Sequence, residues 1–254
     1  MTRNIKILDV VPVILTEMSR LEYRKELFRE IRNATNGLVS IDVIYLEKGV
    51  ASIESAYDEY VSAPYILEKV VWAEENSYDA VIIDCFGDPA LDAARELVRI
   101  PVVGPNQAST HLAALIASRF SIINILRETE NLVRSLVTKY GLVNHLASIE
   151  NIEMPVLDLR KDPDKLLEKI VESAKRAFNE HSANAVVLGC TGMSFVADMA
   201  EERLRSIGIE MPVIDPLRTA IHTAVSLVLL GKSHSKLAYS RPRRKHRVAD
   251  FKIV

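Results

Sequence analysis

Eight short, apolar, β-branched segments alternate with longer helical patterns along nearly the whole chain. Nearly continuous apolar strands separated by helices are typical of a parallel sheet that helices cover on both faces. This alternation therefore predicts an α/β fold. The predicted strands are 5–11, 39–45, 80–84, 102–103, 120–126, 148–152, 185–188 and 213–214. The predicted helices are 17–35, 53–77, 88–98, 107–117, 128–141, 162–181, 194–207 and 216–230. The Asp-Pro pairs at 88–89 and 162–163 predict helix starts, because Asp caps a helix and Pro fits its first turn.

One pattern occurs twice in the same order. The segments "DAVIIDCFGDPALDAARELV" (79–98) and "NAVVLGCTGMSFVADMAEERL" (184–204) each end an apolar strand with a cysteine, followed two residues later by glycine and then by a helix. Each segment is followed by Pro-Val-x-x-Pro, in "PVVGPNQAS" and "PVIDPLRTA". The repeat predicts two related, Rossmann-like (flavodoxin-like) halves; two ordinary strand-to-helix turns of similar composition are the alternative. Ligands bind at the carboxyl ends of strands in open α/β sheets, which makes Cys85 and Cys190 candidate site residues.

Composition excludes several classes of protein. The chain has 254 residues, a formal net charge of −2 and 48% hydrophobic residues, so we expect a full core and no general attraction to nucleic acid. Two cysteines do not make a disulfide framework, and they favour a cytoplasmic location. The N-terminal apolar run lacks a small-residue cleavage site, and no apolar run reaches about 18 residues, so we expect neither a signal peptide nor a membrane span. The basic tail 241–247 is expected to be solvated or to contact another subunit.

The two cysteines allow several kinds of chemistry. A zinc site needs three or four neighbouring His or Cys ligands, and the six histidines are scattered, so we expect no metal. A disulfide across a cleft is disfavoured by distance. A protease-like nucleophile needs a general base, and no Cys-His motif is present.

Two facing thiols support a different scheme. One thiolate can remove a proton from a carbon beside a carbonyl while the opposite thiol donates a proton to the other face, which inverts the stereocentre. A free thiol titrates near pH 8.5, close enough to neutral for both roles. The turns at 85–87 and 190–192 both lead towards helix N-termini, where backbone amides can hold a carbonyl or anionic oxygen. No cofactor is required. The structural alternative is that each cysteine is a small buried hydrophobe at a strand end.

At these residues the sequence resembles the aspartate/glutamate racemase superfamily, and within it the hydantoin racemase branch, which includes allantoin racemases. "CFGDPALDAARELVRIPVVG" (85–104) and "VVLGCTGM" (186–193) resemble the branch's two cysteine motifs. "GVASIESAYDEYVSAP" (49–64) is similar to its Gly-Pro-x-Ser-Ile-Glu segment, and "LVLLGKSHSKLAY" (227–239) is similar to its usual ending. The resemblance covers most of the chain.

The resemblance implies a cofactor-independent racemase made of two pseudosymmetric α/β domains, with the active site in the cleft between them. It implies that Cys85 and Cys190 are the acid/base pair. It implies a discontinuous first domain, 1–106 plus 216–254, a second domain at 107–215, and a homo-oligomer, a tetramer or larger. The expected partner is a small-molecule substrate, with neither nucleic acid nor membrane. The expected substrate-binding residues are Pro12, Phe86, Gly87, Gln107, Thr191 and Gly192.

Two departures from the branch concern the substrate. Only Pro12 remains of the usual Asn-Pro-Asn-Thr motif, with Val11 and Val13 on either side, and Gln107 stands where the branch tends to have Glu. Both changes make the expected pocket less polar or less charged.

The leading expectation is racemisation at C5 of a 5-monosubstituted hydantoin. An apolar 5-substituent or another carbonyl compound is as compatible with the sequence as allantoin. The alternatives are an amino-acid racemase, a maleate-type cis–trans isomerase, or a non-catalytic ligand-binding protein on the same scaffold.

Overall fold

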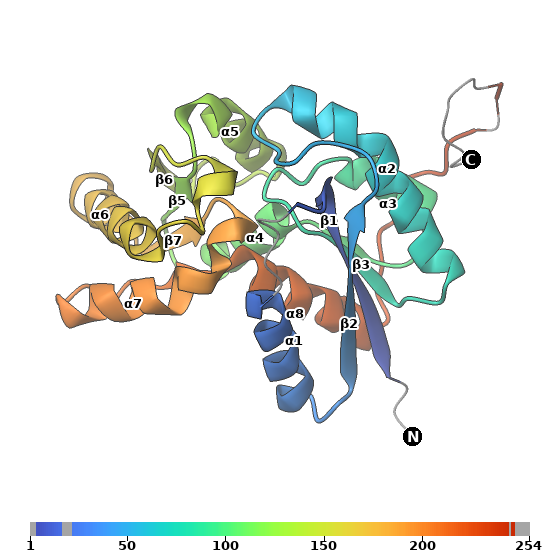
Figure 1. Ribbon diagram of the computed structural model, residues 1–254, viewed down its shortest axis with the longest axis horizontal. Coiled ribbons are helices and arrows are strands. Elements are labelled where there is room, and N and C mark those ends of the chain that lie inside the picture. Colours follow the sequence, from blue (N-terminus) through green and yellow to red (C-terminus); the bar gives the residue numbers. More distant parts are fainter. Residues whose placement is uncertain (1–3, 17–21, 244, 247–254) are drawn as a thin grey trace.

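The computed structural model describes residues 4–16, 22–243 and 245–246, and within them the chain forms two parallel sheets (Figure 1). The first sheet has the strand order β2-β1-β3-β4, and every pair is parallel. Its strands are β1 (Ile5–Ile14), β2 (Val39–Leu46), β3 (Ala80–Ile83) and β4 (Val102–Val103).

The second sheet repeats this topology with the order β6-β5-β7-β8, again entirely parallel. Its strands are β5 (Phe120–Asn124), β6 (Leu146–Asn151), β7 (Ala185–Leu188) and β8 (Val213–Ile214). In each sheet the strand before a cysteine, β3 or β7, is an inner strand. The α/β fold class with two corresponding parallel sheets is therefore confirmed.

Helices cover both faces of each sheet, because the strand residues that point to either face are apolar. In β1, Ile7 faces a core that includes α1 (Glu22–Ala34) and α8 (Pro216–Leu229), whereas Leu8 faces a core that includes α2 (Ala56–Glu75) and α3 (Leu91–Leu97). In β5, Ile123 packs in the core of α6 (Pro163–His181) and α7 (Ala197–Ser206). Ile122 packs in the core of α4 (Pro105–Ile116) and α5 (Glu130–Lys139).

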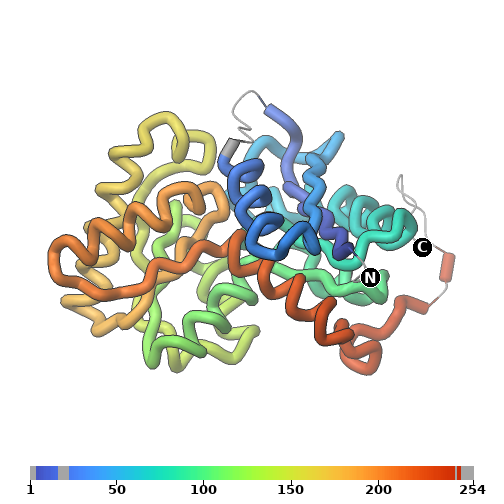
Figure 2. The backbone as a smooth tube through the Cα atoms, turned by 90° about the horizontal axis from the view of Figure 1, so that it is seen from below, coloured from blue at the N-terminus to red at the C-terminus, as the bar shows by residue number. Residues whose placement is uncertain are grey.

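Two helices join the halves. Figure 2 shows the chain passing from the first half into the second and returning along α8. Ala108 of α4 lies in a core of the first sheet and Ala113 of the same helix lies in a core of the second. In α8, Leu217 and Ala220 pack on the first sheet. The predicted division at 106/107 falls within α4, and the domain bounds stay a prediction.

One of the two predicted Asp-Pro helix starts is correct and the other is wrong. Asp162 caps α6 by accepting a hydrogen bond from the Lys165 amide at 3.0 Å. Asp88 instead lies in a tight turn with φ 47°, and α3 begins only at Leu91. The Asp88 side chain turns away from α3, and its carboxylate accepts from backbone amides in the first turn of α4.

After α8 the chain packs back on the first half. His234 Nε2 accepts a hydrogen bond from the Val102 amide at 2.7 Å, and Lys236 Nζ donates to carbonyl oxygens at the end of α3. Of the basic tail 241–247, Arg244 and Arg247 lie outside the described residues. Within the described part of the chain, no helix combines the length and hydrophobicity needed to cross a bilayer.

Candidate active site between the two sheets

Each cysteine lies two residues beyond the inner strand of its sheet, at the carboxyl end. Cys85 follows β3 and Cys190 follows β7. Hydrogen bonds to the neighbouring strands fix both segments: the Asp84 amide donates to Val10 O at 2.8 Å, and the Gly189 amide donates to Ile123 O at 2.7 Å. A Cβ at Gly189 would stand 2.8 Å from that same carbonyl oxygen, so only glycine fits there.

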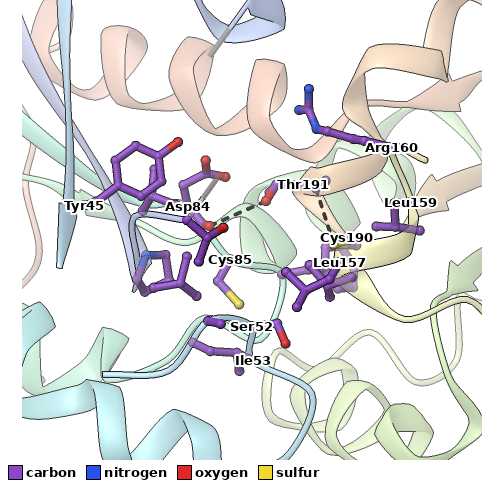
Figure 3. Close-up of a pocket in the computed structure, with 18 of the residues that line it drawn as sticks. Tyr45, Ser52, Ile53, Asp84, Cys85, Leu157, Leu159, Arg160, Cys190 and Thr191 are labelled. Atoms are coloured by element: carbon purple, nitrogen blue, oxygen red, sulfur yellow. Dashed lines mark hydrogen bonds between the residues drawn. The ribbon is translucent and has the colours of Figure 1, made fainter. Parts of the chain in front are cut away.

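Both thiols line one cavity of about 130 Å³ between the halves. Figure 3 shows Cys85 and Cys190 entering it from different segments, with Ser52 and Ile53 below Cys85 and with Tyr45 and Arg160 above the thiols in that view. Both cysteines are free and partly exposed. The lining residues come from β1 and the residues just after it, Arg24 of α1, the end of β2, the loop before α2, the two cysteine turns and the segment 156–160.

Backbone amides in the two cysteine turns contact the thiols themselves. The Gly192 amide donates a hydrogen bond to Cys190 Sγ at 3.3 Å, and a Cβ at Gly192 would stand 3.2 Å from that sulfur. The Gly87 amide makes the corresponding backbone contact with Cys85 and lowers the pKa of that thiol. Donors of this kind favour a thiolate.

Burial opposes ionisation of both thiols. Loss of solvent raises the pKa of Cys85 well above its usual value, and Cys190, Glu59 and Asp88 add to this rise. Burial raises the pKa of Cys190 to about 11, while the Gly192 amide and the Arg24 guanidinium act in the opposite direction. Burial therefore favours the neutral thiol at both cysteines, while the Gly87 and Gly192 amides favour the thiolate.

An arginine and two aspartates support the Cys85 side of the cavity. Arg24 of α1 donates through Nε to Asp84 Oδ2 at 3.0 Å and lies 3.6 Å from Asp9 of β1. Burial and the Asp84 charge raise the pKa of Asp9 well above its ordinary value, while the Arg24 guanidinium acts in the opposite direction. None of these three residues is predicted from the sequence, because an arginine in a polar helix and an aspartate within or just after a strand carry no motif.

A second, smaller cavity of about 50 Å³ adjoins the first behind Cys85, and both thiols line it too. A Cβ at Gly87 would collide with the Glu59 carboxylate and stand 3.6 Å from Cys85 Sγ, so this glycine lets the carboxyl and the thiol lie close together. Burial, followed by the charges of Asp88 and Asp58, raises the pKa of Glu59 to about 7.

Three contacts hold the halves together around the cavity. Thr191 Oγ1 donates to Asp84 O at 3.5 Å, and Glu54 accepts from the Val156 amide at 2.7 Å. Phe86, directly after the first cysteine, is 3% exposed and packs in a core of the second sheet.

The structure brings most of the predicted site residues together. The two cysteines, Pro12, Phe86, Thr191 and Gly192 line the main cavity, and Gly87 lines the smaller one. Gln107 lies outside both. Its side chain accepts a hydrogen bond from Arg95 at 2.6 Å and faces a separate cavity of about 810 Å³ beside α8. The Asp88 carboxylate holds the Gln107 amide in the first turn of α4 at 2.9 Å, and in that position the Gln107 side chain contacts Arg95 and not the thiols. Among the described residues, no cluster of three or more His, Cys, Asp or Glu side chains is suited to hold a metal ion.

The chain is similar to known racemases over nearly its whole length. The profile of the Asp/Glu/hydantoin racemase family matches residues 13–224. A hydantoin racemase of Pseudomonas sp. (strain NS671) is 36% identical over 236 residues, which is 92% of this chain and 93% of that protein. A hydantoin racemase of Paenarthrobacter aurescens is 39% identical over 208 residues, 81% of this chain and 86% of that protein.

Solved structures agree with this assignment. The allantoin racemase from Klebsiella pneumoniae has a TM-score of 0.86 and 33% identity, and the similarity covers 97% of each chain. The family profile spans most of the chain and the sequence relatives exceed 30% identity over more than two thirds of it. The chain therefore belongs to the Asp/Glu/hydantoin racemase family, and the protein is an isomerase of the racemase type.

Proposed function

We propose that the protein racemises 5-monosubstituted hydantoins at C5, without a cofactor, by proton transfer between Cys85 and Cys190. The observation that carries the proposal is that two thiols from equivalent positions in the two sheets line one cavity. The names of the relatives point to the same substrate class.

The chemistry of a hydantoin suits a pair of thiols. C5 lies between a carbonyl carbon and a ring nitrogen, so loss of its proton leaves an electron pair that the carbonyl oxygen accepts as an enolate. Once one thiol has lost its proton, the resulting thiolate removes the C5 proton, and the opposite thiol donates its own proton to the other face of the ring. The enzyme ends with its thiol and thiolate exchanged, ready for the reverse direction. General acid–base groups of this kind contribute about 10²- to 10⁴-fold each.

The apolar lining assists this reaction. Val11, Val13 and Ile53 border the cavity near the thiols. Apolar walls exclude water, which strengthens the interaction of a developing enolate with nearby amides. The amides of Gly87 and Gly192 already contact the sulfurs, and they are positioned to stabilise whichever thiol is ionised.

The direct test follows optically pure 5-benzylhydantoin by polarimetry and by NMR in D₂O. Racemisation with one deuterium entering C5 is expected for the unaltered protein. Cys85→Ser and Cys190→Ser should each lower the inversion rate by at least about 10²-fold, with circular dichroism unchanged. Thr223→Ser, an equally small change on α8, is the matched control. Substantial inversion in either cysteine variant would exclude the two-thiol scheme. Turnover of aspartate, glutamate or maleate in place of hydantoins would exclude the substrate class.

A further inference from the structure

The cavity has a polar wall that proton transfer does not use. Tyr45, near the end of β2, lines the cavity, and its buried hydroxyl has no hydrogen-bond partner in the structure. A buried hydroxyl without a partner is destabilising, and a bound ligand can supply the missing partner. Figure 3 shows Tyr45 and Arg160 both on the side of the cavity away from Ser52 and Ile53.

Arg160 is the second polar group of this wall. Its guanidinium carbon lies over the Phe195 ring at 4.9 Å from the centroid, a contact that holds the group beside the cavity. Among the described residues, no hydrogen bond or ion pair is found for this guanidinium. Arginine is suited to bind a carboxylate with two parallel hydrogen bonds, so a stacked and otherwise uncommitted guanidinium is a ready binding group for one.

The described residues that line the cavity include more arginines than carboxylates, and Asp9, 3.6 Å from Arg24, is not among them. Arg24 and Arg160 are the two arginines among the described lining residues, and Asp84 is the one carboxylate. Asp84 is bound to Arg24. Burial and the Arg24 charge lower the pKa of Arg160, while Tyr45, Asp84 and Cys190 act in the opposite direction.

We infer that Tyr45 and Arg160 form a subsite for a carboxylate on the 5-substituent, so that hydantoins with an acidic side chain are preferred over 5-alkylhydantoins. The inference rests on the proposed function. In this arrangement the ring lies between the thiols, and the acidic arm extends to the polar wall, where it pairs with the Arg160 guanidinium and gives the Tyr45 hydroxyl a partner.

The test compares 5-(2-carboxyethyl)hydantoin with 5-isobutylhydantoin, which have side chains of similar size. With unaltered protein, kcat/KM should be about 10- to 100-fold higher for the acidic substrate. Arg160→Met should remove this preference by raising KM for the acidic substrate while leaving the alkyl substrate nearly unchanged. Arg160→Lys should restore part of the preference, and Tyr45→Phe should lower it about three- to tenfold. Arg205→Met, at an exposed arginine of α7, is the matched control.

Two results would overturn the inference. One is an equal fall in kcat/KM for both substrates in Arg160→Met, which would mean that Arg160 contacts the hydantoin ring and not the 5-substituent. The other is an unaltered protein that racemises the alkyl substrate and shows no preference for the acidic one. If neither compound is racemised, the proposed function fails. The subsite is then tested by calorimetric binding of the acidic hydantoin to the unaltered protein and to Arg160→Met. Tight binding that Arg160→Met abolishes would support the subsite, and equal binding to both proteins would refute it.

Discussion

The two halves of the molecule solve the same capping problem with different residues. In the second half, Asp215 caps its own helix: its carboxylate accepts from the Leu217 and Arg218 amides at 2.8 and 3.2 Å. In the first half, the equivalent position of the Pro-Val-x-x-Pro motif is Gly104, and the carboxylate comes from Asp88. A Cβ at Gly104 would collide with the Asp88 carboxyl group, which occupies the space that a capping side chain on Gly104 itself would need.

This difference ties the Cys85 turn to α4. Asp88 is three residues after Cys85, and its carboxylate accepts from the Asn106 and Gln107 amides and from the Tyr140 hydroxyl. The first cysteine turn is thus held by a helix that also packs on the second sheet. Cys190 instead leads directly into the 3-10 helix Thr191–Val196 and then into α7. The two cysteine turns therefore have similar backbones but different anchors: the Asp88 carboxylate ties the Cys85 turn to α4, whereas the Cys190 turn continues directly into a helix.

The largest expected effect is that of removing the Asp88 carboxylate, which caps α4 from outside the helix. Asp88→Ala removes a buried acceptor of three hydrogen bonds and should lower the free energy of unfolding by about 3 kcal/mol. Racemase activity should fall with it, because the Cys85 turn loses its anchor. Urea unfolding and initial rates measure the two effects. Asp92→Ala, whose exposed carboxylate pairs with Lys139, is the matched control and should cost under about 0.5 kcal/mol.

A second substitution sharpens this comparison. Asp88→Ala combined with Gly104→Asp returns the cap to the position it has in the second half. The double variant should recover about half of the lost stability, but not the lost activity, because the turn after Cys85 stays unanchored. Full recovery of activity would show that Asp88 acts on α4 alone.

The two thiols should also differ in reactivity. Cys190, Glu59 and Asp88 all raise the pKa of Cys85, whereas the Arg24 guanidinium partly offsets the Asp84 and Glu54 carboxylates that raise the pKa of Cys190. Cys190 should therefore ionise more readily and be alkylated by iodoacetamide about tenfold faster at pH 8. Peptide mass spectrometry of unaltered protein gives the ratio, and the two single serine variants give each rate alone. Faster labelling of Cys85 would reverse the assignment.

The smallest expected effect concerns Glu59 and depends on pH. Its pKa is about 7 in the folded protein against 4.5 as the ordinary value, so the folded state holds this proton more tightly. The protonated form is therefore the stabilising one: stability is full below pH 4.5 and is lost as the pH rises through 7. Glu59→Gln should raise the free energy of unfolding by about 1 kcal/mol at pH 8, a value reduced for partial exposure, and leave it unchanged at pH 4.

Urea unfolding at the two pH values measures this effect. Glu75→Gln, at an exposed residue of the same helix, is the matched control. An equal gain from Glu59→Gln at pH 4 and pH 8 would mean that the carboxylate charge is not its cause.

Local sequence patterns predicted the strands and helices, but they did not predict contacts between segments that are far apart in the sequence. The eight strands and eight α-helices of the described residues follow from alternation, and the cysteine pair follows from the repeat. Asp88 was expected to cap α3 because capping was judged from adjacent residues, while its partners lie 18 and 19 residues further along the chain. Gln107 was placed by resemblance, and its orientation depends on that same cap. Arg160 and Tyr45 belong to separate halves, and only the assembled cavity brings them together.

Phe86 gives the site a mechanical property. Its ring is anchored in the core of the opposite half, directly beside the sulfur-bearing residue of its own half. Pulling the halves apart would expose this ring to water at a cost of about 1.5–3 kcal/mol. The ring therefore opposes separation of the two halves directly beside Cys85, and the backbone that carries one sulfur is tied to the core of the other half.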